Sequence, residues 1–155
     1  MIVSLQGQIS DWKYGRGIIM GFINELSDSD LDKILPRKKL NTVRQQIEEL
    51  AIMQGNYVDA LASGTISFDW KPLEDTSKQE LIKRLSELDE NLENALNAFD
   101  GTETINWFGE QKNIHEHISA MIGHEQMHIG QIVAFCYATG IHIPDCVTAT
   151  MSLDG

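Results

Sequence analysis

The sequence predicts an all-α protein folded as a four-helix bundle. Four segments repeat apolar residues at spacings of three and four, the period of an amphipathic helix. Two of them follow capping-box patterns, Thr42 with Gln45 and Ser77 with Glu80, which mark helix starts. A long connection separates the second helix from the third. Four helices with such a connection favour a bundle, in which metal sites lie between facing helices.

The first helix is predicted over residues 8–26, on an apolar stripe that includes Trp12 and Phe22. Three glycines interrupt it: Gly15, Gly17 and Gly21. Each costs about 1 kcal/mol of helix propensity, so this helix must depend on tertiary packing or approach a neighbour closely. Residues 27–40 then form a connection that holds one short helical turn.

The other three helices have clearer ends. The second begins at Asn41 or Thr42 and stops at Gly64, after which residues 65–70 are expected to be extended. The third runs from Ser77 to residue 99 on a regular leucine stripe. The last is capped at Asn113 and continues to residue 139, where Gly140 and the following Pro144 end it. Residues 100–112 are a connection, and residues 145–155 carry no strong signal.

Composition limits the kind of protein this is. The 155 residues are 42% hydrophobic with a net charge of −11, which predicts one globular domain over residues 1–155. Such a charge argues against a nucleic-acid partner, because phosphate backbones bind basic faces. One basic cluster exists, and we interpret it as a solvated loop and helix start; its members are Arg37, Lys38, Lys39 and Arg44.

The sequence lacks the patterns typical of membrane-spanning and exported proteins. No run of 18 apolar residues occurs and no basic region precedes a long apolar one near the start, so we expect a soluble, unexported protein without a membrane partner. Two cysteines, Cys136 and Cys146, are too few for a disulfide scaffold and suit a reducing, cytoplasmic compartment. Cys136 lies about two turns beyond the histidine pair described next, where the simplest interpretation is a small buried residue.

The candidate site begins with His124 and His128. Two histidines four apart on a helix lie about 40° apart around its axis and about 6 Å apart along it, so both rings can reach one ion. The other interpretation is a pair of hydrogen-bonded bundle histidines. Gly130 and Gln131, which follow within a turn, are poor choices for a generic core and favour the metal site. His115 and His117 are expected to be surface or satisfied core residues.

A metalloprotease is a competing interpretation, since His-Glu-x-x-His is also the zincin motif with Glu125 as general base. The extended motif needs glycine at 131 and histidine at 134, where this chain has Gln131 and Ala134. A further candidate is Glu49, beside the apolar stripe of the second helix. Its carboxylate is either solvated at the bundle margin or points inward and needs a cation.

Residues 123–132, Gly-His-Glu-Gln-Met-His-Ile-Gly-Gln-Ile, are followed by Thr-Gly-Ile-His-Ile-Pro at 139–144. Together they resemble the C-terminal signature of the DinB/YfiT-like metal-binding bundles. Members of that family hold a divalent ion with one histidine from the second helix and two, four apart, from the last. The last two correspond to His124 and His128. The first corresponds to Glu49 in Ile-Glu-Glu-Leu-Ala (47–51), so the resemblance implies a His₂Glu site.

The resemblance also implies an activity. Family members include thiol-dependent transferases and isomerases, and hydrolases, which predicts a metal-dependent enzyme acting on a small molecule with Zn, Ni or Fe as cofactor. A low-molecular-weight thiol is one expected partner, and a homodimer another. Gln131, seven residues beyond His124, is expected to touch substrate or orient a ligand. Glu125 lies about 100° around the helix from His124 and is expected behind the ligands or on the surface. The alternative is a degenerate site in a non-catalytic binding or stress-response bundle.

Overall fold

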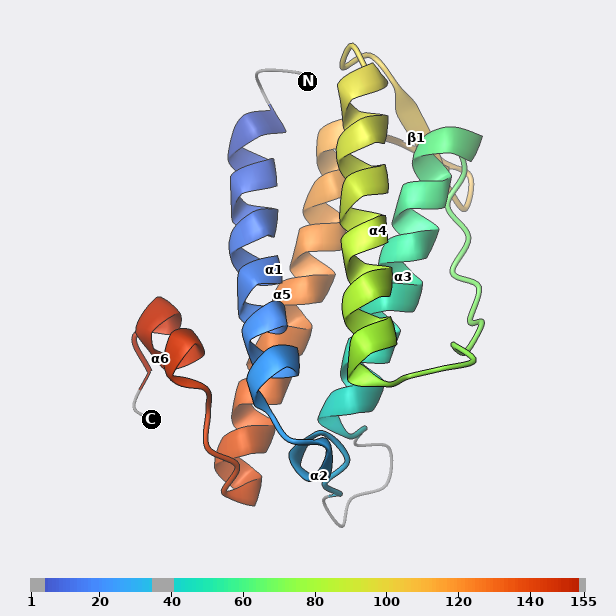
Figure 1. Cartoon of the computed structure of the whole chain (residues 1–155). Helices are drawn as coiled ribbons and strands as arrows, with labels where there is room; N and C mark the ends of the chain where they lie inside the picture. Colours follow the sequence, from blue (N-terminus) through green and yellow to red (C-terminus); the bar gives the residue numbers. More distant parts are fainter. Residues whose placement is uncertain (1–4, 35–40, 154–155) are drawn as a thin grey trace.

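Four long helices lie side by side in a computed structural model that describes residues 5–34 and 41–153 (Figure 1). They are α1 (Gln6–Glu25), α3 (Val43–Ser63), α4 (Lys78–Ala98) and α5 (Ile114–Thr139). The short helix α2 (Asp28–Leu31) is the predicted single turn between the first two. The all-α four-helix bundle is therefore confirmed. Of the basic cluster, Arg37, Lys38 and Lys39 lie outside the described residues.

The predicted helix ends are set by local chemistry. The Thr42 hydroxyl accepts a hydrogen bond from the Gln45 backbone N–H while the Gln45 side chain accepts one from the backbone N–H of Thr42. Asn113 forms the same reciprocal cap with Glu116 at the start of α5. Gly64 and Gly140 end α3 and α5 with φ of 72° and 67°, a left-handed conformation that glycine adopts without strain. These boundaries were predictable because each depends on only a few neighbouring residues.

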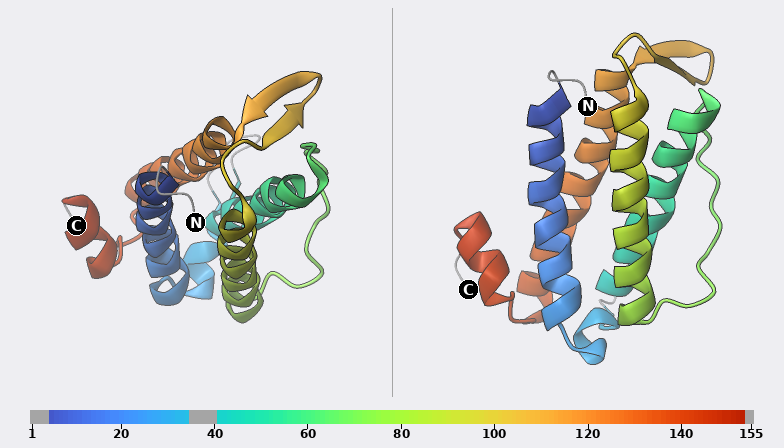
Figure 2. Two further views of the ribbon diagram at one scale, coloured as in Figure 1. Left: turned by 90° about the horizontal axis from the view of Figure 1, so that it is seen from above. Right: turned by 45° about the horizontal axis from the view of Figure 1, so that its top comes forward.

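Helices α3 and α5 face one another along the bundle. Seen from above, the order around the axis is α1, α5, α3, α4 (Figure 2), and α3 packs on both α4 and α5. The core fills the space between all four helices with fully buried side chains, among them Phe22, Ile47, Leu85 and Ile132. Because α3 and α5 are neighbours, polar side chains on their facing edges are brought together.

The segment after α4 is not the simple connection that we predicted. It forms an antiparallel hairpin of β1 (Thr104–Trp107) and β2 (Glu110–Asn113). Its turn residues, Phe108 and Gly109, have φ of 52° and 97°, as a tight two-residue hairpin turn requires. Phenylalanine is an unusual residue at the first of these positions, so the usual Asn-Gly signal was missing. At the start of the segment predicted to be extended after α3, Thr65 bridges to Asn106, while residues 66–70 belong to no strand.

A second unpredicted element is helix α6 (Asp145–Met151), which packs beside α1 (Figure 1). The contact explains one of the glycines of α1. A Cβ atom on Gly21 would lie 2.9 Å from Cys146 Sγ and 2.9 Å from Val147 Cγ2, closer than such atoms approach. Gly15 is similar, with Gln126 Nε2 2.7 Å from the same position. The expected close approach of the first helix to its neighbours is thus confirmed at two glycines.

A helix that crosses a bilayer must be both long and strongly apolar. Within residues 5–34 and 41–153, none combines enough length with enough apolar character to cross a membrane. The longest, α5, has 26 residues but carries two glutamates and four histidines.

Candidate metal centre

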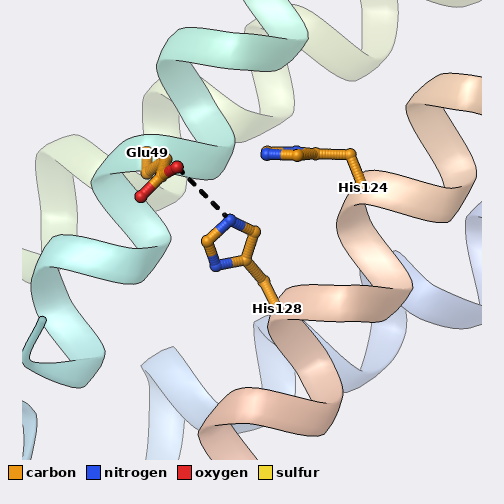
Figure 3. A group of neighbouring side chains, drawn as sticks. All are labelled: Glu49, His124 and His128. Atoms are coloured by element: carbon orange, nitrogen blue, oxygen red, sulfur yellow. Dashed lines mark ion pairs between the residues drawn. The ribbon is translucent and has the colours of Figure 1, made fainter. Parts of the chain in front are cut away.

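Side chains from α3 and α5 converge between these two helices. One donor atom each from Glu49, His124 and His128 lies within 4.8 Å of the other two (Figure 3). Glu49 Oε1 is 3.7 Å from His128 Nε2, and the two imidazole centroids are 4.7 Å apart with their planes at 68°. The structure therefore brings together the three residues that the sequence and the resemblance had singled out.

The local sequence explains why a carboxylate lies at the edge between α3 and α5. Glu49 lies between Ile47 and Leu50, which are 0% and 3% exposed and anchor α3 in the core. Its own side chain is 28% exposed, so it emerges at the edge between α3 and α5. His128 is buried, with 3% of its side chain exposed, and His124 is half-buried one turn before it. The group is thus closed at its base and reachable from the Glu49 side.

The distances suit a divalent ion after small movements. Donors about 2.1 Å from a tetrahedral ion are about 3.4 Å from one another. To reach that value, the 3.7 Å between Glu49 Oε1 and His128 Nε2 must shorten by about 0.3 Å. The other donor atoms, which lie at most 4.8 Å apart, must approach one another by at most about 1.4 Å. Side-chain rotations cover such distances without moving a helix. The three donor atoms are therefore slightly farther apart than in a site that holds an ion.

His128 gives the clearest indication of a missing partner. Both ring nitrogens are buried, and neither has a hydrogen-bond partner among the described residues. A buried polar group left unpaired costs about 1–3 kcal/mol, so native proteins seldom retain one without a reason. The 3.7 Å contact with Glu49 is longer than a hydrogen bond. An ion at His128 Nε2 would satisfy that nitrogen and the Glu49 carboxylate together, and the residues therefore fit a metal.

Burial favours the uncharged form of both imidazole rings. Burial lowers the pKa of His124 below its usual value, against the opposing pull of the Glu49 carboxylate. Burial also lowers the pKa of His128, and the neighbouring His124 lowers it further, while Glu49 again opposes. Both imidazoles are consequently neutral at neutral pH. Neutral imidazole is the form that binds a metal.

Comparison with known proteins identifies the family of this chain. The family model of the DinB superfamily matches residues 12–132, which is most of the chain and includes Glu49, His124 and His128. The chain belongs to the DinB superfamily. No curated protein matches the sequence. Bundles of this superfamily bind metals, which agrees with a metal-binding role for the group that the geometry brings together.

In this DinB-superfamily bundle Glu125 faces α1. It is only 5% exposed, its Oε1 lies 3.3 Å from Arg16 Nη1, and burial raises its pKa to about 7 although Arg16 opposes the shift. The third donor beside the histidine pair comes from α3, and the downstream His142 instead contacts Asp145 at the surface, at 3.3 Å. This arrangement argues against the metalloprotease interpretation, which needs Glu125 at the ion.

The remaining histidines and Gln131 have other surroundings. His117 is a satisfied core residue: Trp107 Nε1 donates to its Nδ1 at 3.1 Å, and its Nε2 donates to the Tyr57 carbonyl at 3.0 Å. His115 Nδ1 donates to the Gln8 side chain at 2.8 Å. Gln131 is exposed on α5 and outside the donor group, so its contact with substrate stays a prediction.

Sequence reasoning missed a buried polar cluster beside the site, in which Arg16 meets Gln54, Asp89 and Glu125. A signal was present in α1. Arg16 lies four residues after Trp12 and three before Ile19, in register with the apolar stripe, so an inward-facing guanidinium was implied. Gly15 and Gly17, on either side of Arg16, interrupt the apolar pattern and obscure this register.

Proposed function

We propose that this protein is a metal-dependent enzyme in which Glu49, His124 and His128 hold one divalent transition metal, zinc, nickel or iron. The supporting observation is the buried His128 ring, which lies beside a carboxylate and a second neutral imidazole. Neither of its nitrogens has a hydrogen-bond partner in the part of the chain that the structure describes. A His₂Glu set leaves a coordination position open for a ligand from solution. The substrate is a small molecule that reaches the site from the partly exposed Glu49 side.

The proposed reaction is of the thiol-dependent transferase or the hydrolase type. When bound, the metal lowers the pKa of a thiol or of water and so supplies a nucleophile at neutral pH. The protein keeps both rings unprotonated through burial, and it holds His128 where solvent cannot compete for its nitrogens. Glu49 contributes a negative charge that reduces the net charge of the loaded site.

Metal analysis of protein purified without a polyhistidine tag tests the proposal. We expect close to one equivalent of a transition metal in the wild type and almost none in His128→Ala or Glu49→Ala. His115→Ala is the matched control, because His115 is on the same helix but bonds Gln8 instead of the donor group. Transfer of small electrophiles to low-molecular-weight thiols then separates the transferase from the hydrolase.

The competing function is a non-catalytic binding or stress-response bundle with a degenerate site. It predicts a wild type without metal whose melting temperature is unchanged by chelators. That result would overturn the enzyme proposal, because the three side chains would then hold no metal.

We also propose a homodimer that pairs through α5. From Ser119 to Ala138 this helix exposes nine residues, none of them charged, in a chain whose net charge is −11. Met127 and Tyr137 on this face are 48% and 52% exposed. A second copy of so acidic a chain meets the least repulsion at an uncharged face. Light scattering after size exclusion should give twice the chain mass, and Met127→Glu should give the monomer.

A cytoplasmic location is the last part of the proposal. Both cysteines are free, Cys136 in the core and Cys146 at the surface. Persistent free thiols suit a reducing compartment. Fractionation of cells that express the protein tests this, and recovery outside the cytoplasm would contradict it.

A further inference from the structure

Arg16 is a buried cation that joins the four long helices. Its side chain, on α1, is only 8% exposed. Its Nε donates to Asp89 Oδ1 on α4 at 3.1 Å, and its Nη2 donates to the side-chain Oε1 of Gln54 on α3. Its Nη1 lies 3.3 Å from Glu125 Oε1 on α5, and Gln54 Nε2 donates back to Asp89 at 2.9 Å. Each of the three guanidinium nitrogens thus contacts a different helix.

This cluster borders the candidate metal centre. Gln54 follows Glu49 by five residues, about 7.5 Å along α3, and Glu125 directly follows His124 on α5. A cavity of about 10 Å³ is lined by residues of both groups, among them Arg16, Gln54, Glu125 and His124. Its volume is about that needed for one water molecule. The cluster and a proposed metal ligand therefore share one cavity wall.

Stability alone is a weak reason for such a cluster. Buried ion pairs are often no more stabilising than well-packed apolar residues, because removing two charges from water is costly. What a planar, three-way guanidinium supplies is geometry, since its donors point in fixed directions. Here Nη2 is hydrogen-bonded to α3, and Nη1 forms an ion pair with Glu125 on α5 without a hydrogen bond. Both of these helices carry part of the donor group. The spacing of the two helices determines whether the donors converge.

We propose that Arg16 is a positioning residue for the metal centre, holding α3 and α5 at the separation at which Glu49, His124 and His128 reach one ion. The inference rests on the proposed function, because it requires that these residues bind a metal. Residues around a metal site that act through the ligands typically change metal affinity by about 10–100-fold when mutated.

Titration of the full-length, metal-free protein with Co²⁺ tests the inference through the visible absorption of the bound ion. The variant is Arg16→Lys, because one ammonium keeps the charge but cannot contact three helices at once. We expect Co²⁺ to bind at least about tenfold more weakly, with an altered spectrum. The matched control is Arg44→Lys, since Arg44 is 13% exposed and bridges Asp28, Asp32 and the Thr76 carbonyl in the same way. It should lose stability but bind Co²⁺ within about twofold of the wild type.

The outcomes separate the two proposals. A wild type that binds no Co²⁺ overturns the proposed function and this inference with it. A wild type that binds Co²⁺, with a folded Arg16→Lys that binds equally well, overturns the inference and leaves the metal centre intact. If Arg16→Lys does not fold, Gln54→Met is used, because it removes the contact of Arg16 with α3, together with the Gln54–Asp89 hydrogen bond, but no charge. Unchanged Co²⁺ affinity in that variant also overturns the inference, and weaker binding supports it.

Discussion

Exchange of the Glu49 carboxylate for an amide, Glu49→Gln, gives the sharpest test of the metal centre. Without metal the change should be small: Glu49 contacts His128 only at 3.7 Å, and its side chain is 28% exposed. A partly exposed contact of this kind contributes about 0–1 kcal/mol to the free energy of unfolding. The wild type and the variant should therefore melt at nearly the same temperature in a chelator.

With metal the two should differ strongly. Zn²⁺ at about 100 times its Kd adds about 2.7 kcal/mol to the unfolding free energy of the wild type. For a chain of this size that is a rise of about 5–11 °C in Tm. Residues that only support a metal ligand cost up to about 100-fold in affinity, so loss of a charged ligand should cost at least that much. The same Zn²⁺ concentration is then near the Kd of Glu49→Gln and adds only about 0.4 kcal/mol.

The assay is thermal unfolding followed by circular dichroism, with and without Zn²⁺. Glu48→Gln is the matched control, because it removes the same charge one residue away. Glu48 Oε1 accepts a hydrogen bond from the Leu73 backbone N–H at 3.0 Å, and glutamine keeps that acceptor. The reasoning fails if Glu49→Gln retains the full rise in Tm, or if Glu48→Gln loses it equally.

Three further predictions follow from the site and its surroundings. Glu49→His should keep most of the Zn²⁺-dependent rise in Tm, since it creates the three-histidine set typical of the family, and a loss as large as in Glu49→Gln would contradict this. Burial raises the pKa of Cys136 to about 11. A chromogenic disulfide reagent at pH 8 should therefore label only the exposed Cys146 in the native protein, and both thiols after denaturation. Two fast-reacting thiols in the native protein would be inconsistent with the fold. Burial also lowers the pKa of His117 below its usual 6.5, so the unfolded chain binds more protons there and the unfolding free energy should fall as pH drops below about 6.5. In His117→Gln, measured by urea unfolding, that decline should be shallower, and an identical pH profile would refute the assignment.

Much of the fold could be predicted because helix starts and stops are local. The Thr42 and Asn113 caps each require residues only three positions apart, and both are present as expected. The hairpin and α6 were missed for the opposite reason. The hairpin turn places Phe108 in a left-handed conformation, and α6 is held by its contact with Gly21, far away in sequence. Tertiary contacts decide such elements, and they leave little trace in local composition.

In the candidate site too, some residues can be predicted from local sequence and others depend on tertiary packing. The spacing of His124 and His128 is enough to place both rings on one face of a helix, since helical geometry alone relates them. The position of Glu49 depends on how α3 packs against α5, so its inclusion required the family resemblance. Arg16 contacts partners on three other helices, and only its register with the apolar stripe of α1 indicated that it faces inward.

The identity of the third donor also bears on which nucleophile the site suits. A carboxylate in place of an imidazole leaves the loaded site about one charge less positive, and so makes it a weaker acid catalyst. A thiol with a pKa of about 8.5 needs its pKa lowered by only about 1.5 to ionise at pH 7, whereas water, at about 15.7, needs a far larger shift. Under the proposed function, the weaker site would favour thiol transfer over hydrolysis. By the same reasoning, Glu49→His should increase hydrolysis relative to thiol transfer, and an unchanged ratio would mean that the charge of the third ligand does not select the nucleophile.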